Sequence, residues 1–221
     1  MKIFDYDGPL MTVLTQIFDL VVLNLITLVM CVPIVTAGAS LTAMHYVLWH
    51  SVRQEGDSIW KMYWRSFRQN FKQATLIWLG VLAIIAVLML DWGLTGYMSA
   101  SAANVMKILI AVLAFLLLCW LQYLFPLLSR YENTSRQTMK NAMALIAGYM
   151  PRTLGMVACW VIDGYLLYSL SIRWMPLFLM GGLSLPGYLC ALLYNPIFKK
   201  LEGAEDEKKE EDSDASESGK A

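Results

Sequence analysis

The N-terminal part of the chain contains an apolar stretch that water-soluble folds do not accommodate. Between Met11 and Val52 there is no Lys, Arg or Glu, and Asp19 is the sole carboxylate. A membrane span requires only about 18 consecutive apolar residues. The whole chain is 58% hydrophobic and 15% charged, whereas soluble domains are about 45–50% apolar and about 25% charged. The sequence therefore predicts an all-α, polytopic transmembrane helical bundle.

Five segments are apolar and long enough to be full spans. A helix of about 23 residues rises on the order of 35 Å, which exceeds a hydrocarbon core of about 30 Å. Residues 38–52 are also apolar, but about fifteen residues rise only about 22 Å. We therefore expect a short partial helix there, either re-entrant or lying at the membrane interface, and the side of the N-terminus depends on whether it crosses. The predicted spans are approximately 10–33, 76–98, 105–128, 153–171 and 176–198.

The basic residues are distributed unevenly among the predicted loops. Of the 17 Lys and Arg, only Lys2, Lys107 and Arg173 lie outside the two long loops and the C-terminal tail. Because positive charges are retained on the cytoplasmic side, we expect both loops and the tail to be cytosolic. Seventeen Asp and Glu balance the cations, so no net positive field points to nucleic acid. We divide the chain into a transmembrane domain, 1–200, and a disordered acidic cytosolic tail, 201–221.

Residues 57–75, in the first predicted cytosolic loop, carry aromatic and basic side chains with helical spacing. Four aromatic residues recur at intervals of 4, 3 and 4, and four basic residues repeat these intervals one position later. Each set therefore shares one face of a helix. Rings beside a stripe of cations are typical of an interfacial helix, which either anchors the loop at the lipid surface or docks a partner. The residues are Trp60, Trp64, Phe67 and Phe71, and Lys61, Arg65, Arg68 and Lys72.

Four polar side chains within the predicted spans form a candidate intramembrane polar site. A carboxylate at the bilayer centre costs about 2.5–3.5 kcal/mol on insertion scales, which makes such residues functional candidates. Asp163 lies nearest the middle of its span, whereas Asp91 is close to an outer end and Asp19 is about a third of the way along. Gln122 completes the set. Each carboxylate can equally be protonated or paired, in which case its role is structural.

The sequence lacks the motifs that carry catalysis or bind cofactors. It contains neither the G-x-x-x-x-G-K-[ST] phosphate loop nor the G-x-S-x-G serine motif. The four cysteines are far apart and form no C-x-x-C pair, so neither a disulfide framework nor a zinc site is indicated. His45 and His50 are five residues apart, which places them on different faces of a helix. We therefore expect no enzymatic activity, no metal and no cofactor.

Two blocks of the sequence are specific enough to resemble a known family. Residues 33–46, P-I-V-T-A-G-A-S-L-T-A-M-H-Y, resemble the P-I-V-T-x-G-A-S-x-x-A-x-Y-Y element of the YesL-like family. Residues 66–75, S-F-R-Q-N-F-K-Q-A-T, resemble its second block, S-F-K-x-N-F-K-Q-A-T. The family consists of bacterial integral membrane proteins of unassigned biochemical function, encoded beside sugar-uptake ABC transporter components. The resemblance implies a location in the bacterial plasma membrane and a role beside carbohydrate uptake.

The first block has the chemistry of a tight turn between two helices. Pro33 ends the first helix, because proline lacks an N–H donor and restricts the residue before it. Small residues such as Gly38 let helices approach closely in lipid. We expect Thr36 and Ser40 to satisfy backbone groups freed at the turn. The alternative is that this block lines a groove for a substrate or partner. The residues of this motif turn are Pro33, Thr36, Gly38, Ser40 and Thr42.

Two functions remain open from the sequence. The first is a non-enzymatic accessory or regulatory partner of a carbohydrate ABC uptake system, in which permease subunits contact the basic aromatic helix and the tail. The alternative is a transporter of a small solute, a sugar or an oligosaccharide, with Asp163, Asp91 or Gln122 lining its path. In both cases the lipid bilayer surrounds the chain and no nucleic acid is involved. The sequence does not specify the sugar or the oligomeric state.

Overall fold

The computed structural model describes residues 9–53, 58–131, 134–170 and 175–218, and every regular element in these ranges is a helix. Within them, four helices are long and apolar enough to cross a membrane. A fifth span is present if two consecutive helices that meet at 102° count as one broken span. The predicted all-α, multi-pass class is therefore confirmed, and the expected number of about five spans agrees with it.

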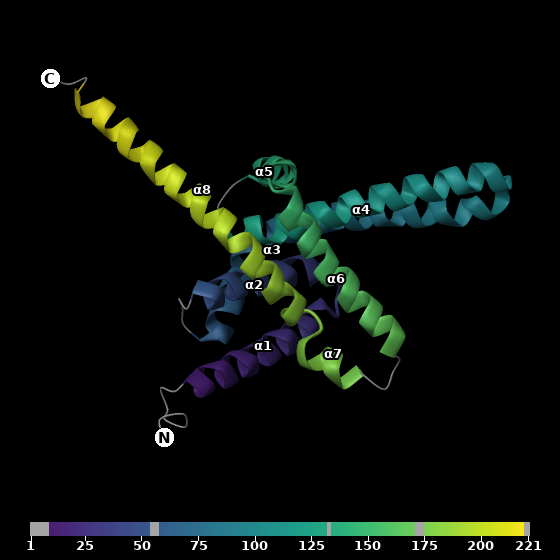
Figure 1. The fold of residues 1–221 in the computed structure, drawn as a ribbon, viewed down its shortest axis with the longest axis horizontal. Coiled ribbons are helices and arrows are strands. Elements are labelled where there is room, and N and C mark those ends of the chain that lie inside the picture. Colours follow the sequence, from purple (N-terminus) through teal and green to yellow (C-terminus); the bar gives the residue numbers. More distant parts are fainter. Residues whose placement is uncertain (1–8, 54–57, 132–133, 171–174, 219–221) are drawn as a thin grey trace.

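Two of the long helices form a hairpin that projects away from the other helices (Figure 1). α3 (Ile59–Leu94) leads through the short 3-10 helix η2 (Thr95–Tyr97) into α4 (Ala100–Arg130). A surface of exposed large apolar side chains is stable among lipid tails and costly in water. We infer that the outer half of the hairpin faces the bilayer. Its exposed apolar side chains include Met89, Leu90, Val105 and Ile108.

α3 is one continuous helix across the expected boundary between loop and span. The amphipathic stretch predicted over 57–75 is helical from Ile59 onward, and it runs without a break into the span predicted to begin at Leu76. No proline or glycine occurs between Ile59 and Leu79, so no residue in this stretch interrupts the helix. The amphipathic stretch is therefore the first part of a long helix and not a separate element.

α2 (Ala37–Arg53) is the short helix expected over 38–52, and it lies at the centre of the fold (Figure 1). It packs against α1, α3, α4 and α8. Gly38, Ala39 and Ala43 on this helix are buried, and small residues of this kind allow close approach between helices in lipid. α2 is thus a core helix that its neighbours surround.

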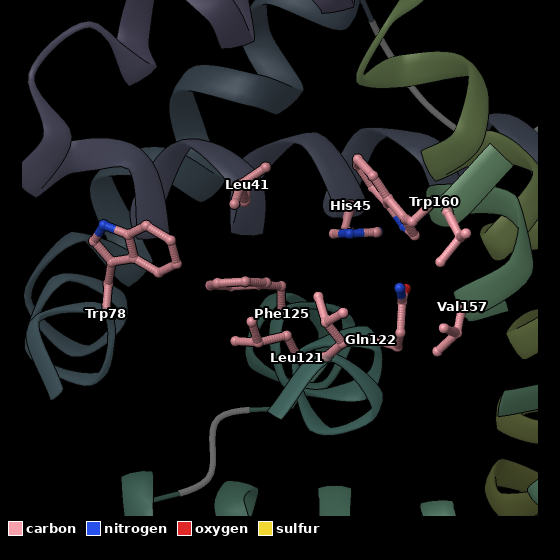
Figure 2. A pocket seen from close by; sticks show the side chains of 10 residues that line it. Leu41, His45, Trp78, Leu121, Gln122, Phe125, Val157 and Trp160 are labelled. Atoms are coloured by element: carbon pink, nitrogen blue, oxygen red, sulfur yellow. The ribbon is translucent and has the colours of Figure 1, made fainter. Parts of the chain in front are cut away.

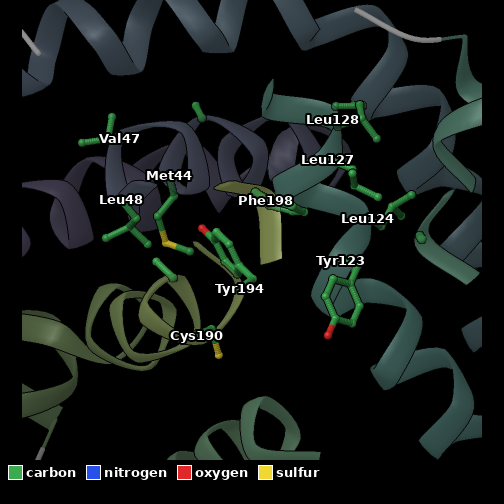
Figure 3. Packing of buried hydrophobic residues seen from close by; sticks show 14 of the residues in the cluster. Met44, Val47, Leu48, Tyr123, Leu124, Leu127, Leu128, Cys190, Tyr194 and Phe198 are labelled. Carbon is green, nitrogen blue, oxygen red and sulfur yellow. The ribbon is translucent and has the colours of Figure 1, made fainter. Parts of the chain in front are cut away.

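The main apolar core forms where α2 meets the end of α4 and the helix α8 (Ser184–Ser218). Tyr194 and Phe198 on α8 are 0% and 1% exposed. Figure 3 shows Tyr194 beside Met44 and Leu48 of α2. These long side chains join helices that are far apart in sequence, so the core holds the C-terminal helix against the N-terminal half of the chain.

α8 continues beyond the predicted end of the transmembrane domain. Its first residues after the boundary are not separate from the bundle, because Leu201 packs against the apolar core and the side chain of Glu202 is paired with α2 and α4. The helix runs as far as Ser218. The disorder expected for 201–221 stays a prediction, but the boundary between bundle and tail lies after Glu202.

The remaining helices include one break that the sequence analysis did not predict. α1 (Pro9–Cys31) corresponds to the first expected span, and α6 (Met150–Leu170) to the fourth. The span expected over 176–198 is present as the candidate span Phe178–Gly203, which contains a break between α7 (Met175–Gly181) and α8. Gly181 and Gly182 favour a break there, because glycine is a poor helix former. α5 (Ser135–Gly148) precedes α6 and forms with it the pair bent by 102°.

Candidate functional site

The motif turn joins α1 to α2 through the hydroxyl groups expected from the sequence. Thr36 is the last residue of the 3-10 helix η1 (Ile34–Thr36). Its Oγ1 donates to the carbonyl oxygens of Met30, at 2.6 Å, and Pro33, at 2.8 Å. Ser40 Oγ donates to the carbonyl oxygen of Thr27 at 3.0 Å. The side chains therefore bond to carbonyl groups near the end of α1 and in the turn after it, where the helical hydrogen-bond pattern is interrupted.

The two resemblance blocks pack against each other. A Cβ atom on Gly38 would lie 2.4 Å from Cβ of Trp78 and 2.8 Å from the carbonyl oxygen of Ala74. Tyr63 OH lies 2.7 Å from Ser40 Oγ, and Trp78 Nε1 donates to the carbonyl oxygen of Ile34 at 2.8 Å. Only a glycine leaves room for this contact between α2 and α3. The motif turn is thus a structural junction, and Trp78, which packs on Gly38, also lines a nearby cavity.

A cavity of about 320 Å³ lies between α2, α3, α4 and α6 (Figure 2). Its walls are mainly apolar and aromatic, with Leu41 on α2 and Trp78 on α3 at one side and Phe125 on α4 below them. Two polar side chains, His45 and Gln122, also line it. An apolar pocket with a few converging polar groups is the usual form of a small-molecule site, so this cavity is the candidate functional site.

His45 contributes an imidazole to the wall of the cavity. The residue is 4% exposed, and Nδ1 lies 3.3 Å from Tyr194 OH. No carboxylate among the described residues is paired with it. A buried charge without a partner is strongly unfavourable, so the ring is neutral and one ring nitrogen donates while the other accepts. The sequence alone indicates only that His45 and His50 lie on different faces of a helix, and it does not assign His45 to a site.

Gln122 is the member of the predicted polar site that reaches the cavity. It is 7% exposed, and Figure 2 shows its amide pointing towards His45 and Trp160. Among the described residues, no hydrogen bond is formed by this amide. Buried amides are normally hydrogen-bonded. The unpaired amide therefore marks the cavity as a place where a ligand can bind.

The three aspartates do not join Gln122, so the predicted four-residue polar site is not assembled. Asp19 lies on α1, Asp91 near the outer end of α3, and Asp163 on α6, and all three are half-buried. Asp163 is one turn beyond Trp160 but is not part of the cavity wall. In the described ranges none of the three forms an ion pair, and no cluster of His, Cys, Asp and Glu could hold a metal ion.

The basic aromatic stretch of α3 is a second candidate site, and most of it is exposed. Rings at successive positions stack along the helix, with centroids of Trp64 and Phe67 5.5 Å apart. Phe67 is only 8% exposed and belongs to the core, whereas Trp60 is 57% exposed. The guanidinium of Arg68 lies 5.0 Å from the Trp64 ring. All four predicted cations of this stretch, Lys61, Arg65, Arg68 and Lys72, are exposed.

An ionic cluster that the sequence analysis missed joins the ends of α2 and α4 to the middle of α8. Arg53 Nη2 lies 2.9 Å from Glu202 Oε2, and Arg53 Nε donates to Asn195 Oδ1 at 3.0 Å. Arg130 also pairs with Glu202. The guanidinium of Arg130 lies 5.0 Å from the ring of Trp49. The sequence showed these residues only as loop cations and as the start of an acidic tail, and no local pattern indicates their pairing.

The comparisons with known proteins agree with the resemblance found in the sequence. Residues 20–92 match the family described as "Protein of unknown function, DUF624". Both resemblance blocks lie within this match, so the resemblance is confirmed there. The chain is 30% identical over 115 residues to "Uncharacterized protein YteU" of Bacillus subtilis (strain 168), which covers 52% of this chain and 51% of that protein. The chain thus spans about half the length of this relative. No solved structure matches it.

Proposed function

We propose that this DUF624-type membrane protein is a non-enzymatic accessory or regulatory partner of a carbohydrate ABC uptake system, and that it docks on a permease subunit through the basic aromatic stretch of α3. The observation that carries the proposal is the continuity of α3 from Ile59 to Leu94. The association with carbohydrate uptake comes from the resemblance to the YesL-like family, and the docking surface comes from the geometry of the helix.

The length of α3 favours a protein partner over a purely lipid anchor. From Leu76, where the apolar part begins, back to Trp60 the helix rises on the order of 25 Å. The headgroup layer on each side of a bilayer is about 5–8 Å thick. If the apolar part of α3 spans the bilayer, the basic stretch extends beyond the headgroups. Cations at Lys61 and Arg65 then lie where they can contact an acidic surface of another protein.

Co-purification tests this proposal directly. The full-length chain, tagged and expressed in its native membrane with the sugar ABC permease subunits present, is extracted in mild detergent and captured. We expect the permease subunits to be retained by the unchanged chain and to be reduced about tenfold by the double substitution Arg65→Glu and Arg68→Glu. The matched control is Arg136→Glu with Lys140→Glu, which reverses two exposed charges on α5.

Two results would contradict the proposal. One is a capture in which no permease subunit accompanies the unchanged chain. The other is an equal loss of subunits with the α3 and α5 reversals, because a general effect of charge would then explain both. The alternative function, solute transport by the chain alone, predicts flux of labelled sugar in proteoliposomes that contain this protein and no other.

A further inference from the structure

The cavity beside Gln122 is open towards the lipid-facing surface of the bundle. α4 and α6 are joined by a hydrogen-bond contact of 3.1 Å between Tyr123 OH and Thr153 Oγ1. Further along the two helices, the cavity wall includes Leu118, which is 44% exposed, and Val161, which is 58% exposed. A molecule dissolved in the bilayer can therefore reach the cavity between α4 and α6 without crossing the apolar core.

The chemistry of the wall restricts the ligand to an uncharged, mainly apolar molecule. No Lys, Arg, Asp or Glu lines the cavity, so a phosphate or carboxylate group would lie there without a partner, which is unfavourable. A sugar ring is equally unsuitable, because it would bring several hydroxyl groups to a wall with few polar side chains. One hydroxyl or carbonyl group, in contrast, can pair with the amide of Gln122, which both donates and accepts.

The aromatic residues complete this chemistry. Trp78, Phe125 and Trp160 provide flat apolar surfaces along the cavity (Figure 2), and such surfaces bind hydrocarbon or ring systems through area burial. The volume of about 320 Å³ accommodates a head group and the first part of a chain, with the rest of the chain extending between α4 and α6 into the bilayer. Pockets of about 300 Å³ and more are typical ligand sites.

We propose that the cavity between α2, α3, α4 and α6 binds a neutral lipid with a single hydroxyl or carbonyl head group, which pairs with Gln122 and lies beside His45. The site is separate from the basic stretch of α3, so the inference does not depend on the proposed accessory function. The lipid would enter laterally, past Leu118 and Val161, and its head group would satisfy an amide that has no partner among the described residues.

Photolabelling of the full-length protein in proteoliposomes tests the inference. Three probes with the same diazirine-bearing chain of sixteen carbons are compared: a long-chain alcohol, the corresponding fatty acid and a phosphatidylcholine. Labelled peptides are identified by mass spectrometry. We expect the alcohol to label residues 118–125 of α4 and 157–161 of α6, to be displaced by unlabelled hexadecanol, and to label these peptides at least about tenfold more than either the fatty acid or the zwitterionic phospholipid.

Two substitutions distinguish a specific site from general contact with lipid. Gln122→Leu removes the amide, and Val157→Trp fills the cavity while leaving Gln122 in place, so each should reduce labelling of these peptides about tenfold. The matched control is Gln69→Leu, an exposed glutamine on α3, which should change nothing. Size-exclusion profiles establish that each variant is folded. If one cavity variant does not fold, the other variant and the competition by unlabelled alcohol still decide the matter.

Three results would overturn the inference. Labelling spread evenly over exposed positions of the α3–α4 hairpin would show only contact with bulk lipid. Equal labelling of the cavity peptides by the fatty acid or the phospholipid would contradict selection for a single hydroxyl or carbonyl head group. A photoreactive residue placed at Val157 that cross-links in native membranes to a second protein, and not to lipid, would show that a partner helix occupies the cavity.

Discussion

Asn24 uses its whole hydrogen-bonding capacity at the break between α7 and α8. Nδ2 donates to the carbonyl oxygens of Phe178, at 3.0 Å, and Leu179, at 2.8 Å. Oδ1 accepts from the backbone N–H groups of Leu183, at 2.8 Å, and Ser184, at 3.1 Å. Helix breaks inside a membrane are tolerated when other groups satisfy the freed backbone. A single side chain on α1 therefore stabilises a broken helix more than 150 residues away.

Replacing Asn24 should destabilise the protein without changing its helical content. Asn24→Leu removes four hydrogen bonds; the Phe178 carbonyl still accepts from the N–H of Gly182, but the other three backbone groups lose Asn24 as their partner. Each buried polar group left unpaired costs about 1–3 kcal/mol, so the free energy of unfolding, measured by titration with a denaturing detergent, is expected to fall by at least the cost of one such group. Thr15→Val is the control on the same helix, because Thr15 is exposed and bonds only to its own helix. Equal effects of the two substitutions would refute the role assigned to Asn24.

At the scale of elements, α2 and α3 approach each other closely at Gly38. The missing side chain at Gly38 allows Trp78 and the backbone at Ala74 to approach, and the hydroxyl of Ser40 accepts from Tyr63 O–H while it donates to Thr27. The small residues of the first resemblance block are explained by this contact. The helices α1, α4 and α8 also pack against α2, so a larger side chain at this contact is expected to change the orientation of α3.

A methyl group at this junction should be destabilising. Gly38→Ala places Cβ 2.4 Å from a Trp78 side-chain atom and 2.8 Å from a backbone oxygen, so α3 must shift, at a cost of about 1–3 kcal/mol. Gly80→Ala on α3 is the matched control, because nothing lies within 4 Å of the added atom. It should be neutral or stabilising by up to about 1 kcal/mol. Thermal unfolding of both variants in the same detergent provides the measurement, and a stable Gly38→Ala would contradict the packing.

The sequence predicted those elements whose signals are local. The apolar runs predicted α1, α6 and the two helices of the α3–α4 hairpin. The short apolar run over 38–52 predicted a helix of about the length that α2 has. The break before Ser184 was missed, because it depends on Asn24 as well as on the local glycines. Residues of the candidate cavity come from four helices, and of these only Gln122 was predicted as part of a polar site, since a polar residue within an apolar span is a local signal. The pairing of Glu202 with Arg53 has no local signal.

At the scale of the molecule, the ionic cluster at Glu202 joins the N-terminal, middle and C-terminal parts of the chain. Arg53 ends α2, Arg130 ends α4, and Glu202 lies on α8. The side chain of Arg130 is 4% exposed, whereas that of Glu202 is 37% exposed. Solvent screening therefore weakens the ion pairs. The cluster positions the start of the C-terminal tail more than it determines the stability of the bundle.

Neutralising this carboxylate should release the end of α8. Glu202→Gln leaves Arg53 and Arg130 near each other without their shared anion, so the helix should separate from the bundle more often. We expect trypsin to cleave after Lys199 or Lys200 about three- to tenfold faster, while the midpoint of thermal unfolding changes by only a few degrees, consistent with about 1 kcal/mol. Lys140→Gln on α5 is the control. Unchanged cleavage in Glu202→Gln would contradict the role of the cluster.

The central claim for the whole molecule is that α3 carries its basic stripe away from the bilayer. Spin labels placed singly at residues 61, 65, 68 and 72, in a background in which the native cysteines are replaced, report depth through collision with oxygen and with a water-soluble nickel complex. In lipid nanodiscs without a partner, a continuous α3 predicts a steady increase in distance from the bilayer, on the order of 16 Å from residue 72 to residue 61. Equal depths at all four positions would show that this stretch lies flat on the membrane, and would contradict the account.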